Sequence, residues 1–66
     1  MFDGKLMRDI REKKNLSQFE LYELTGIKPE YISKVENNIY PNVGIVNLAK
    51  IADALECKVD DFMAKE

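Results

Sequence analysis

Four polar residues recur at helical spacing near the middle of the chain. Their spacing is i, i+3, i+4, i+7, which puts them in one stripe along an α-helix. They are Glu30, Ser33, Lys34 and Asn37. A carboxylate, a hydroxyl, an ammonium and an amide can together donate and accept hydrogen bonds and carry both signs of charge. Periodicity alone favours an ordinary solvent-exposed face, so assigning a function to the stripe needs support from the rest of the chain.

The composition argues against most catalytic chemistry. The 66-residue chain has no histidine and one cysteine, Cys57. It therefore lacks the commonest general base and metal ligand, and it cannot form an intramolecular disulfide. No apolar run is long enough for a signal peptide or a membrane span. We expect a non-enzymatic cytoplasmic protein without metal or cofactor, in which Cys57 is a small buried hydrophobe.

The charge is distributed unevenly along the chain. The net charge of −2 mildly disfavours nucleic-acid binding, which usually needs a basic surface. However, residues 1–34 carry seven Lys or Arg against six Asp or Glu, a sum of +1, whereas residues 35–66 carry three against six, a sum of −3. A basic face with an acidic back is therefore compatible with the sequence. The length predicts one domain over residues 1–66, and the initial Met leads us to expect a complete small protein.

Capping residues and apolar spacing predict five short helices and no strand. The clearest start is at Ser17, which with Glu20 forms a capping box. Gly26 is expected to end that helix, since glycine adopts the left-handed conformation most easily. Pro29 suits the first position of the next helix. The expected helices cover about residues 3–14, 17–25, 29–36 and 44–55, with a short fifth from 59.

The remaining boundaries follow from similar signals. Asp3 is expected to cap the first helix and Asn15 to end it. Residues 37–43, "NNIYPNV", are predicted to form a loop. The fourth helix is predicted to bury one apolar stripe, made of Ile45, Leu48, Ile51, Ala52 and Leu55. The link between residues 25 and 29 is too short for antiparallel packing, which predicts a steep helix-turn-helix crossing over residues 17–36.

Four stretches carry a resemblance to a known family. "LSQFEL", "TGI", "YISKVEN" and "LAKIADAL" together resemble the lambda-repressor-like, Cro-type helix-turn-helix domains over residues 6–62. The resemblance implies a compact, all-α, five-helix domain whose third helix enters the DNA major groove. It implies a sequence-specific transcriptional regulator, a repressor of a palindromic operator. The partners would be double-stranded DNA and a second copy of the chain, because one small domain makes too few contacts alone.

The same resemblance assigns roles to individual residues. The base-contacting positions would be Pro29, Glu30, Ser33 and Lys34. The backbone-contacting positions would be Ser17, Gln18, Lys28, Tyr31, Asn37, Asn38 and Tyr40. Arg11 and Glu36 would form a buried ion pair between the first and third helices. At base edges, Glu30 could accept from cytosine, Lys34 could donate to guanine, and Ser33 could do either.

Helix 17–25 departs from the family pattern in three places. Tyr22 stands where alanine is usual, so its ring must swing outward or the helix crossing must open. Phe19 and Leu24 occupy positions that are often polar. Phe19, Tyr22 and Leu24 either pack in the core against the third or fourth helix or form an apolar patch for a partner protein, and the sequence leaves both alternatives open. This helix and the acidic balance support a second hypothesis, an interaction module such as an antitoxin or anti-repressor.

Other departures lie at helix ends and near the termini. Lys28 replaces the usual Ser or Thr cap, and Glu56 replaces a common glycine after the fourth helix. Four apolar residues near the ends either complete the core or form a two-fold interface. They are Phe2, Val59, Phe62 and Met63.

Overall fold

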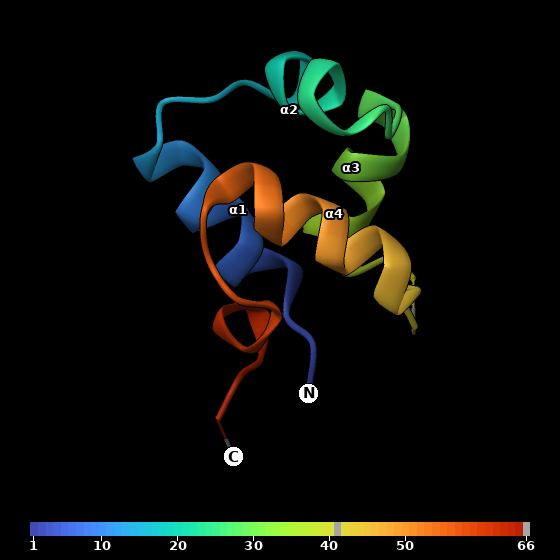
Figure 1. The fold of residues 1–66 in the computed structure, drawn as a ribbon. Helices are drawn as coiled ribbons and strands as arrows, with labels where there is room; N and C mark the ends of the chain where they lie inside the picture. The colour runs from blue at the N-terminus through green and yellow to red at the C-terminus, as the bar shows by residue number, and fades with distance from the viewer. Residues whose placement is uncertain (41, 66) are drawn as a thin grey trace.

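The computed structural model describes residues 1–40 and 42–65, and this part of the chain is built from helices (Figure 1). They are α1 (Gly4–Lys13), α2 (Gln18–Thr25), α3 (Pro29–Glu36), α4 (Ile45–Leu55) and the 3₁₀ helix η1 (Val59–Phe62). The all-α prediction is confirmed. The fifth helix is a 3₁₀ turn, the form that helices of a few residues commonly take. Pro41, part of the predicted loop, lies outside the described residues.

The predicted helix starts are formed as expected. The Asp3 carboxylate accepts a hydrogen bond from the backbone N–H of Lys5 at 3.0 Å. Ser17 and Glu20 form the complete capping box, with bonds of 3.0 and 2.9 Å. Pro29 is the first residue of α3, and Lys28 precedes it without a side-chain capping bond. The local sequence therefore determines where α1, α2 and α3 begin.

Each described α-helix is followed within two residues by a residue in the left-handed conformation. The φ angle is 57° at Asn15, Asn38 and Glu56, and 76° at Gly26. After α3, the N–H of Asn38 donates to the carbonyl of Val35 at 3.1 Å, and that of Ile39 donates to Lys34 at 3.0 Å. This is the Schellman arrangement, which satisfies the last carbonyls of a helix. The predicted ends at Asn15 and Gly26 are confirmed.

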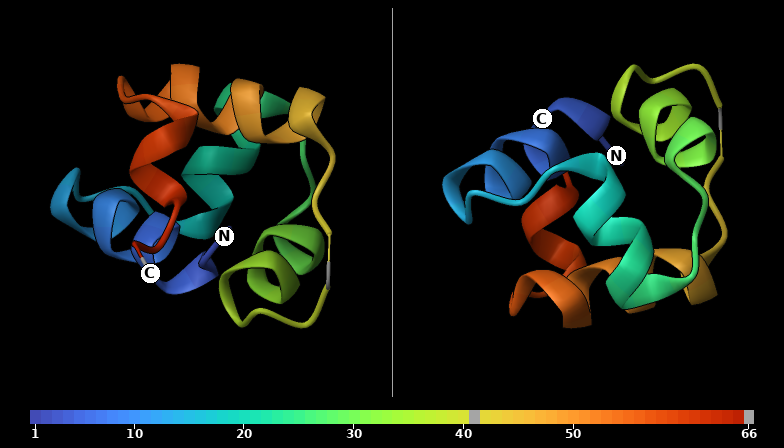
Figure 2. Two further views of the ribbon diagram at one scale, coloured as in Figure 1. Left: turned by 90° about the horizontal axis from the view of Figure 1, so that it is seen from below. Right: turned by 90° about the horizontal axis from the view of Figure 1, so that it is seen from above.

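The core lies between the helices, and α1 to α4 and η1 all contribute to it. Its buried apolar residues are Met7, Leu21, Ile27, Ile32, Val35, Leu48, Ile51, Ala52, Leu55 and Phe62. The predicted stripe of α4 is correct except at Ile45, which is 65% exposed. The first turn of α4 lies at one edge of the molecule (Figure 2), and its neighbouring residue Val46 is exposed as well.

The two ends of the chain pair with each other at one end of the molecule (Figures 1 and 2). The N–H of Asp3 donates to the carbonyl of Phe62 at 2.8 Å, and that of Ala64 donates to Met1 at 2.7 Å. Phe62 is fully buried, and the Phe2 ring meets it edge-on at 6.4 Å. Val59 and Met63 are half-buried against the core. The terminal apolar residues therefore complete the core.

Candidate nucleic-acid interface

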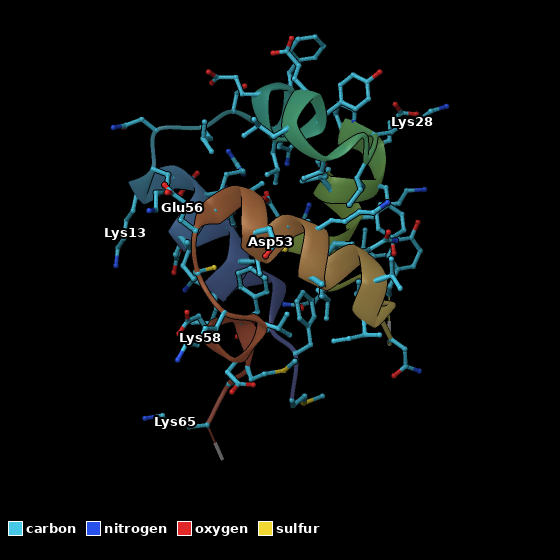
Figure 3. All side chains as sticks on the ribbon, in the orientation of Figure 1. Lys13, Lys28, Asp53, Glu56, Lys58 and Lys65 are labelled. Atoms are coloured by element: carbon cyan, nitrogen blue, oxygen red, sulfur yellow. The ribbon has the colours of Figure 1, made fainter. Side chains whose placement is uncertain are left out.

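A tight turn fixes α3 relative to α2. The hydroxyl of Thr25 donates to the carbonyl of Leu21 at 2.8 Å and accepts from the N–H of Ile27 at 3.1 Å. Ile27 is buried in the core, so the connection is held by both hydrogen bonding and packing. Figure 3 shows Lys28, the next residue, pointing away from the molecule. Sequence analysis missed the core role of Ile27 because an isolated apolar residue in a turn has no periodicity.

α3 has two distinct faces. Ile32 and Val35 are fully buried, and Glu36 is 4% exposed. On the opposite face Glu30, Lys34 and Asn37 are exposed and Ser33 is half-buried. Within the part of the chain that the structure describes, neither Glu30 nor Lys34 forms a side-chain hydrogen bond or an ion pair. The predicted polar stripe is therefore exposed on the surface, with its two charges available to a partner.

The far end of α3 is tied to α1 and α2 by a buried ionic network. The Arg11 guanidinium donates to both Glu36 carboxylate oxygens, at 2.6 and 3.0 Å, and to the Leu16 carbonyl at 2.6 Å. The Gln18 amide donates to the same carboxylate at 3.0 Å. The bond to Glu36 raises the pKa of Arg11 above its ordinary value. Three helices thus meet at Glu36, which fixes the direction of α3.

A second contact joins the start of α1 to the end of α3. A Cβ added at Gly4 would lie 2.0 Å from the Val35 carbonyl oxygen, so only glycine permits this approach. The Gly4 N–H donates to the side-chain carbonyl of Asn38 at 2.7 Å, and the Asn38 amide donates to the Asp3 carboxylate at 3.0 Å. The bond from the Asn38 amide lowers the pKa of Asp3 most, and the bond from the Lys5 N–H lowers it further.

Sequence analysis missed the role of Gly4. The available signal was its position inside a predicted helix, where glycine is a poor helix former and needs a reason to be present. Asn38 was assigned to DNA backbone contact from the resemblance alone. In the structure its side-chain amide is already bonded to the start of α1 through both its oxygen and its nitrogen.

The other candidate backbone contacts lie at the two ends of the motif. Ser17 and Gln18 lie at the start of α2, and Asn37 follows α3. Tyr31 and Tyr40 are half-buried with ring centroids 5.1 Å apart. The side chain of Asn47, a residue that sequence analysis passed over, donates to the Tyr31 hydroxyl at 3.4 Å. The structure thus brings Tyr31, from α3, together with Tyr40, from the following loop.

Of the two alternatives for this helix, core packing is wrong for Phe19 and Leu24. They are 58% and 60% exposed. Leu21 is the residue that α2 buries. The half-buried Tyr22 ring lies 5.7 Å from the Phe19 ring, which agrees with the outward placement rather than with a ring between α2 and α3.

Cys57 is half-buried and packs against the core, as expected for a small hydrophobe. Burial raises the pKa of its thiol, and Asp61 adds to the effect. Among the described residues, no helix is long and apolar enough to cross a membrane.

The proteins that this chain resembles in sequence are helix-turn-helix transcriptional regulators. A helix-turn-helix family model matches residues 7–62. YopS, a prophage-derived helix-turn-helix-type transcriptional regulator of Bacillus subtilis, is 34% identical over 57 residues, covering 86% of this chain and 77% of YopS. SinR, a helix-turn-helix-type transcriptional regulator of Bacillus subtilis, is 30% identical over 60 residues. That match covers 91% of this chain and 54% of SinR, so the chain spans about half the length of SinR.

Two solved structures superpose closely on this fold. The restriction-modification controller protein C.AhdI from Aeromonas hydrophila gives a TM-score of 0.84 at 35% identity, covering 91% of this chain and 89% of that one. The crystal structure of SinR, the master regulator for biofilm formation, in complex with DNA gives a TM-score of 0.85 at 30% identity, covering 91% and 98%.

Proposed function

The chain belongs to the Cro/C1-type helix-turn-helix family, and on that premise we propose that it is a sequence-specific DNA-binding transcriptional regulator. The observation that carries the proposal is the division of α3 into a buried, ionically fixed face and an exposed polar face. A rigid inner face holds the outer side chains in one geometry, which is what base reading requires. The relationship to SinR, whose structure with DNA shares this fold, supports the proposal.

We assign base reading to the start and middle of α3. Glu30 is an acceptor for the amino group of cytosine, and Lys34 is a donor to guanine O6 and N7. Ser33 serves either role, and Pro29 lies beside them at the first position of the helix. Because Glu30 and Lys34 have no partner among the described residues, they reach a base edge without first breaking a protein contact.

We assign the grip on the DNA backbone to both ends of the motif. Ser17, Gln18 and Lys28 supply the contacts at the starts of α2 and α3, where helix N-termini also attract phosphates. Asn37, Tyr31 and Tyr40 supply them at the far end of α3. Sequence analysis adds Asn38 to this set, and its amide is already bonded to Gly4 and Asp3 within the protein. These contacts position α3 without reading sequence.

The regulator acts as a homodimer on a two-fold symmetric operator, and we place it in the cytoplasm as a repressor. One domain of this size offers few contacts, so a second copy is needed for useful affinity. Three exposed aliphatic side chains are available for a dimer interface. They are Ile39, Ile45 and Val46, each at least 60% exposed.

Selection from random duplex DNA tests this function. We expect the wild type to enrich a palindrome and to lose affinity as salt rises, because bound phosphates release counterions. Glu30→Ala and Lys34→Ala should each relax the preference at one position of each half-site. Lys50→Ala is the matched control, since Lys50 is exposed on α4 and has no assigned DNA contact. Failure to enrich any sequence at low salt would contradict the proposal.

A second candidate is a protein-interaction module such as an antitoxin or anti-repressor. The exposure of Phe19 and Leu24 favours it, because large apolar side chains on a surface often mark protein contacts. In that case the purified protein would carry a stoichiometric partner that Phe19→Ser releases. If Phe19→Ser leaves partner content and operator binding unchanged, this candidate fails.

A further inference from the structure

We propose that the two side-chain hydrogen bonds made by Asn38, here called the Asn38 bridge, position the DNA-backbone contacts that follow α3. The bridge joins Asn38 to the Gly4 N–H and to the Asp3 carboxylate. This inference rests on the proposed function. It makes Asn38 and Asp3 positioning residues, which act on DNA binding through their neighbours.

The backbone of Asn38 explains why its placement matters. It is the left-handed residue that closes α3, with φ of 57°. Asn37 directly precedes it, and the loop that carries Tyr40 begins one residue later. The Schellman hydrogen bonds fix the backbone of Asn38 relative to α3. The Asn38 bridge adds a tie to the start of α1, so the contacts on either side of Asn38 are also held relative to α1.

The other side of the bridge is itself anchored. Asp3 caps α1 through the Lys5 N–H, and its own N–H donates to the Phe62 carbonyl at 2.8 Å. Gly4 contacts the end of α3 so closely that no side chain fits between them. The paired chain ends therefore serve as the fixed support against which the end of α3 and the following loop are placed.

A charge exchange separates positioning from direct phosphate contact. Asn38→Asp keeps an acceptor for Gly4 but sets a carboxylate against that of Asp3, so we expect operator affinity to fall about tenfold. Adding Asp3→Asn removes the repulsion and keeps a capping side chain, and affinity should return to within about threefold of wild type. If Asn38 touches phosphate directly, its carboxylate repels DNA in both variants. A double variant as weak as Asn38→Asp would overturn the proposal.

Asp9→Asn provides the matched control for net charge. Asp9 is an exposed carboxylate on α1, the helix that Asp3 caps. Asp9 and Asn38 line one shallow hollow on the surface. Asn38→Asp with Asp9→Asn has the same total charge as the exchanged pair but keeps the repulsion from Asp3. We expect it to stay weak. If this control recovers operator affinity as fully as Asn38→Asp with Asp3→Asn does, the effect is one of general charge, and that result would also overturn the proposal.

Asn38→Gly separates positioning from stability. Glycine keeps the left-handed backbone and deletes both bonds, so the variant should fold and bind the operator about fivefold more weakly. Unchanged affinity with lowered stability would reduce the bridge to a structural role. The backbone amide signals of Ile39, Tyr40 and Val43 should move in Asn38→Asp and return in the exchanged pair. If the wild type binds no DNA, the proposed function fails, and these signals still decide whether the bridge positions the loop.

Discussion

The two faces of α3 differ in how their polar groups are used. On the inner face, Glu36 is almost fully buried and accepts three hydrogen bonds from Arg11 and Gln18. On the outer face, Glu30 is exposed and accepts none from the described residues. The same residue type therefore fixes the helix on one side and is available to a partner on the other. Changes on the inner face should alter stability, and changes on the outer face should alter recognition.

The largest expected effect comes from breaking the buried ion pair. Arg11→Met leaves Glu36 as a buried carboxylate without its counter-charge, which should lower the unfolding free energy by about 3–5 kcal/mol. Urea denaturation measures this directly. Arg11→Met with Glu36→Leu removes both charges and should recover most of the loss. A double variant no more stable than the single one would show that the network contributes more than charge compensation.

The next effect is steric and lies at the α1–α3 contact. Gly4→Ala places a Cβ 2.0 Å from the Val35 carbonyl oxygen, so α1 and α3 must separate. We expect a loss of about 3 kcal/mol, at the upper end of the range for overpacking. Lys5→Ala, one residue along and exposed, should change stability by less than about 0.5 kcal/mol. Equal stability of Gly4→Ala and wild type would contradict the close approach.

A smaller effect on stability is expected at the end of α4, where no DNA contact is assigned. Glu56 ends α4 with φ of 57°, a conformation in which its Cβ is crowded. Glu56→Gly should therefore raise the unfolding free energy by about 0.5–1 kcal/mol, even though it removes an exposed ion pair with Lys14. Asn15→Gly is the control and should gain less, because asparagine tolerates this conformation. A gain at Asn15 as large as at Glu56 would refute the explanation.

The smallest effect is a pH dependence at Asp3. Its pKa in the folded protein is lowered below the ordinary value of 3.8. A lowered pKa means that the ionised carboxylate stabilises the fold above the unfolded pKa, and that this contribution is lost as pH falls through the folded pKa. Urea titrations from pH 5 to about 2.5 should show a steeper loss of stability in wild type than in Asp3→Asn. Parallel curves for the two proteins would show that the ionised Asp3 carboxylate does not stabilise the fold.

The features that the sequence predicts correctly are local. The Ser17–Glu20 capping box and the left-handed ends at Asn15 and Gly26 involve residues within one turn of each other. Each of these features depends on a few neighbouring side chains, so the sequence alone predicts it. Helical spacing also identified the polar stripe of the third helix, and the resemblance to a family added the Arg11–Glu36 pair, which local signals do not predict.

The features that sequence analysis missed depend on distant contacts. Gly4 and Asn38 are 34 residues apart and meet only because α1 and α3 pack together. Periodicity placed Ile45 on the apolar face of α4, but it does not say where along its length a helix enters the core. Phe19 is two residues from Leu21, about 200° around the helix, so it lies on the face of α2 opposite to the buried one.

Lys34→Ala tests whether the outer face of α3 reads DNA without supporting the fold. The measurement is operator affinity by titration at fixed salt, paired with urea denaturation of the same protein. We expect stability within about 0.5 kcal/mol of wild type and affinity at least about tenfold lower, with preference relaxed at one base pair. Unchanged affinity and preference for the operator would contradict it.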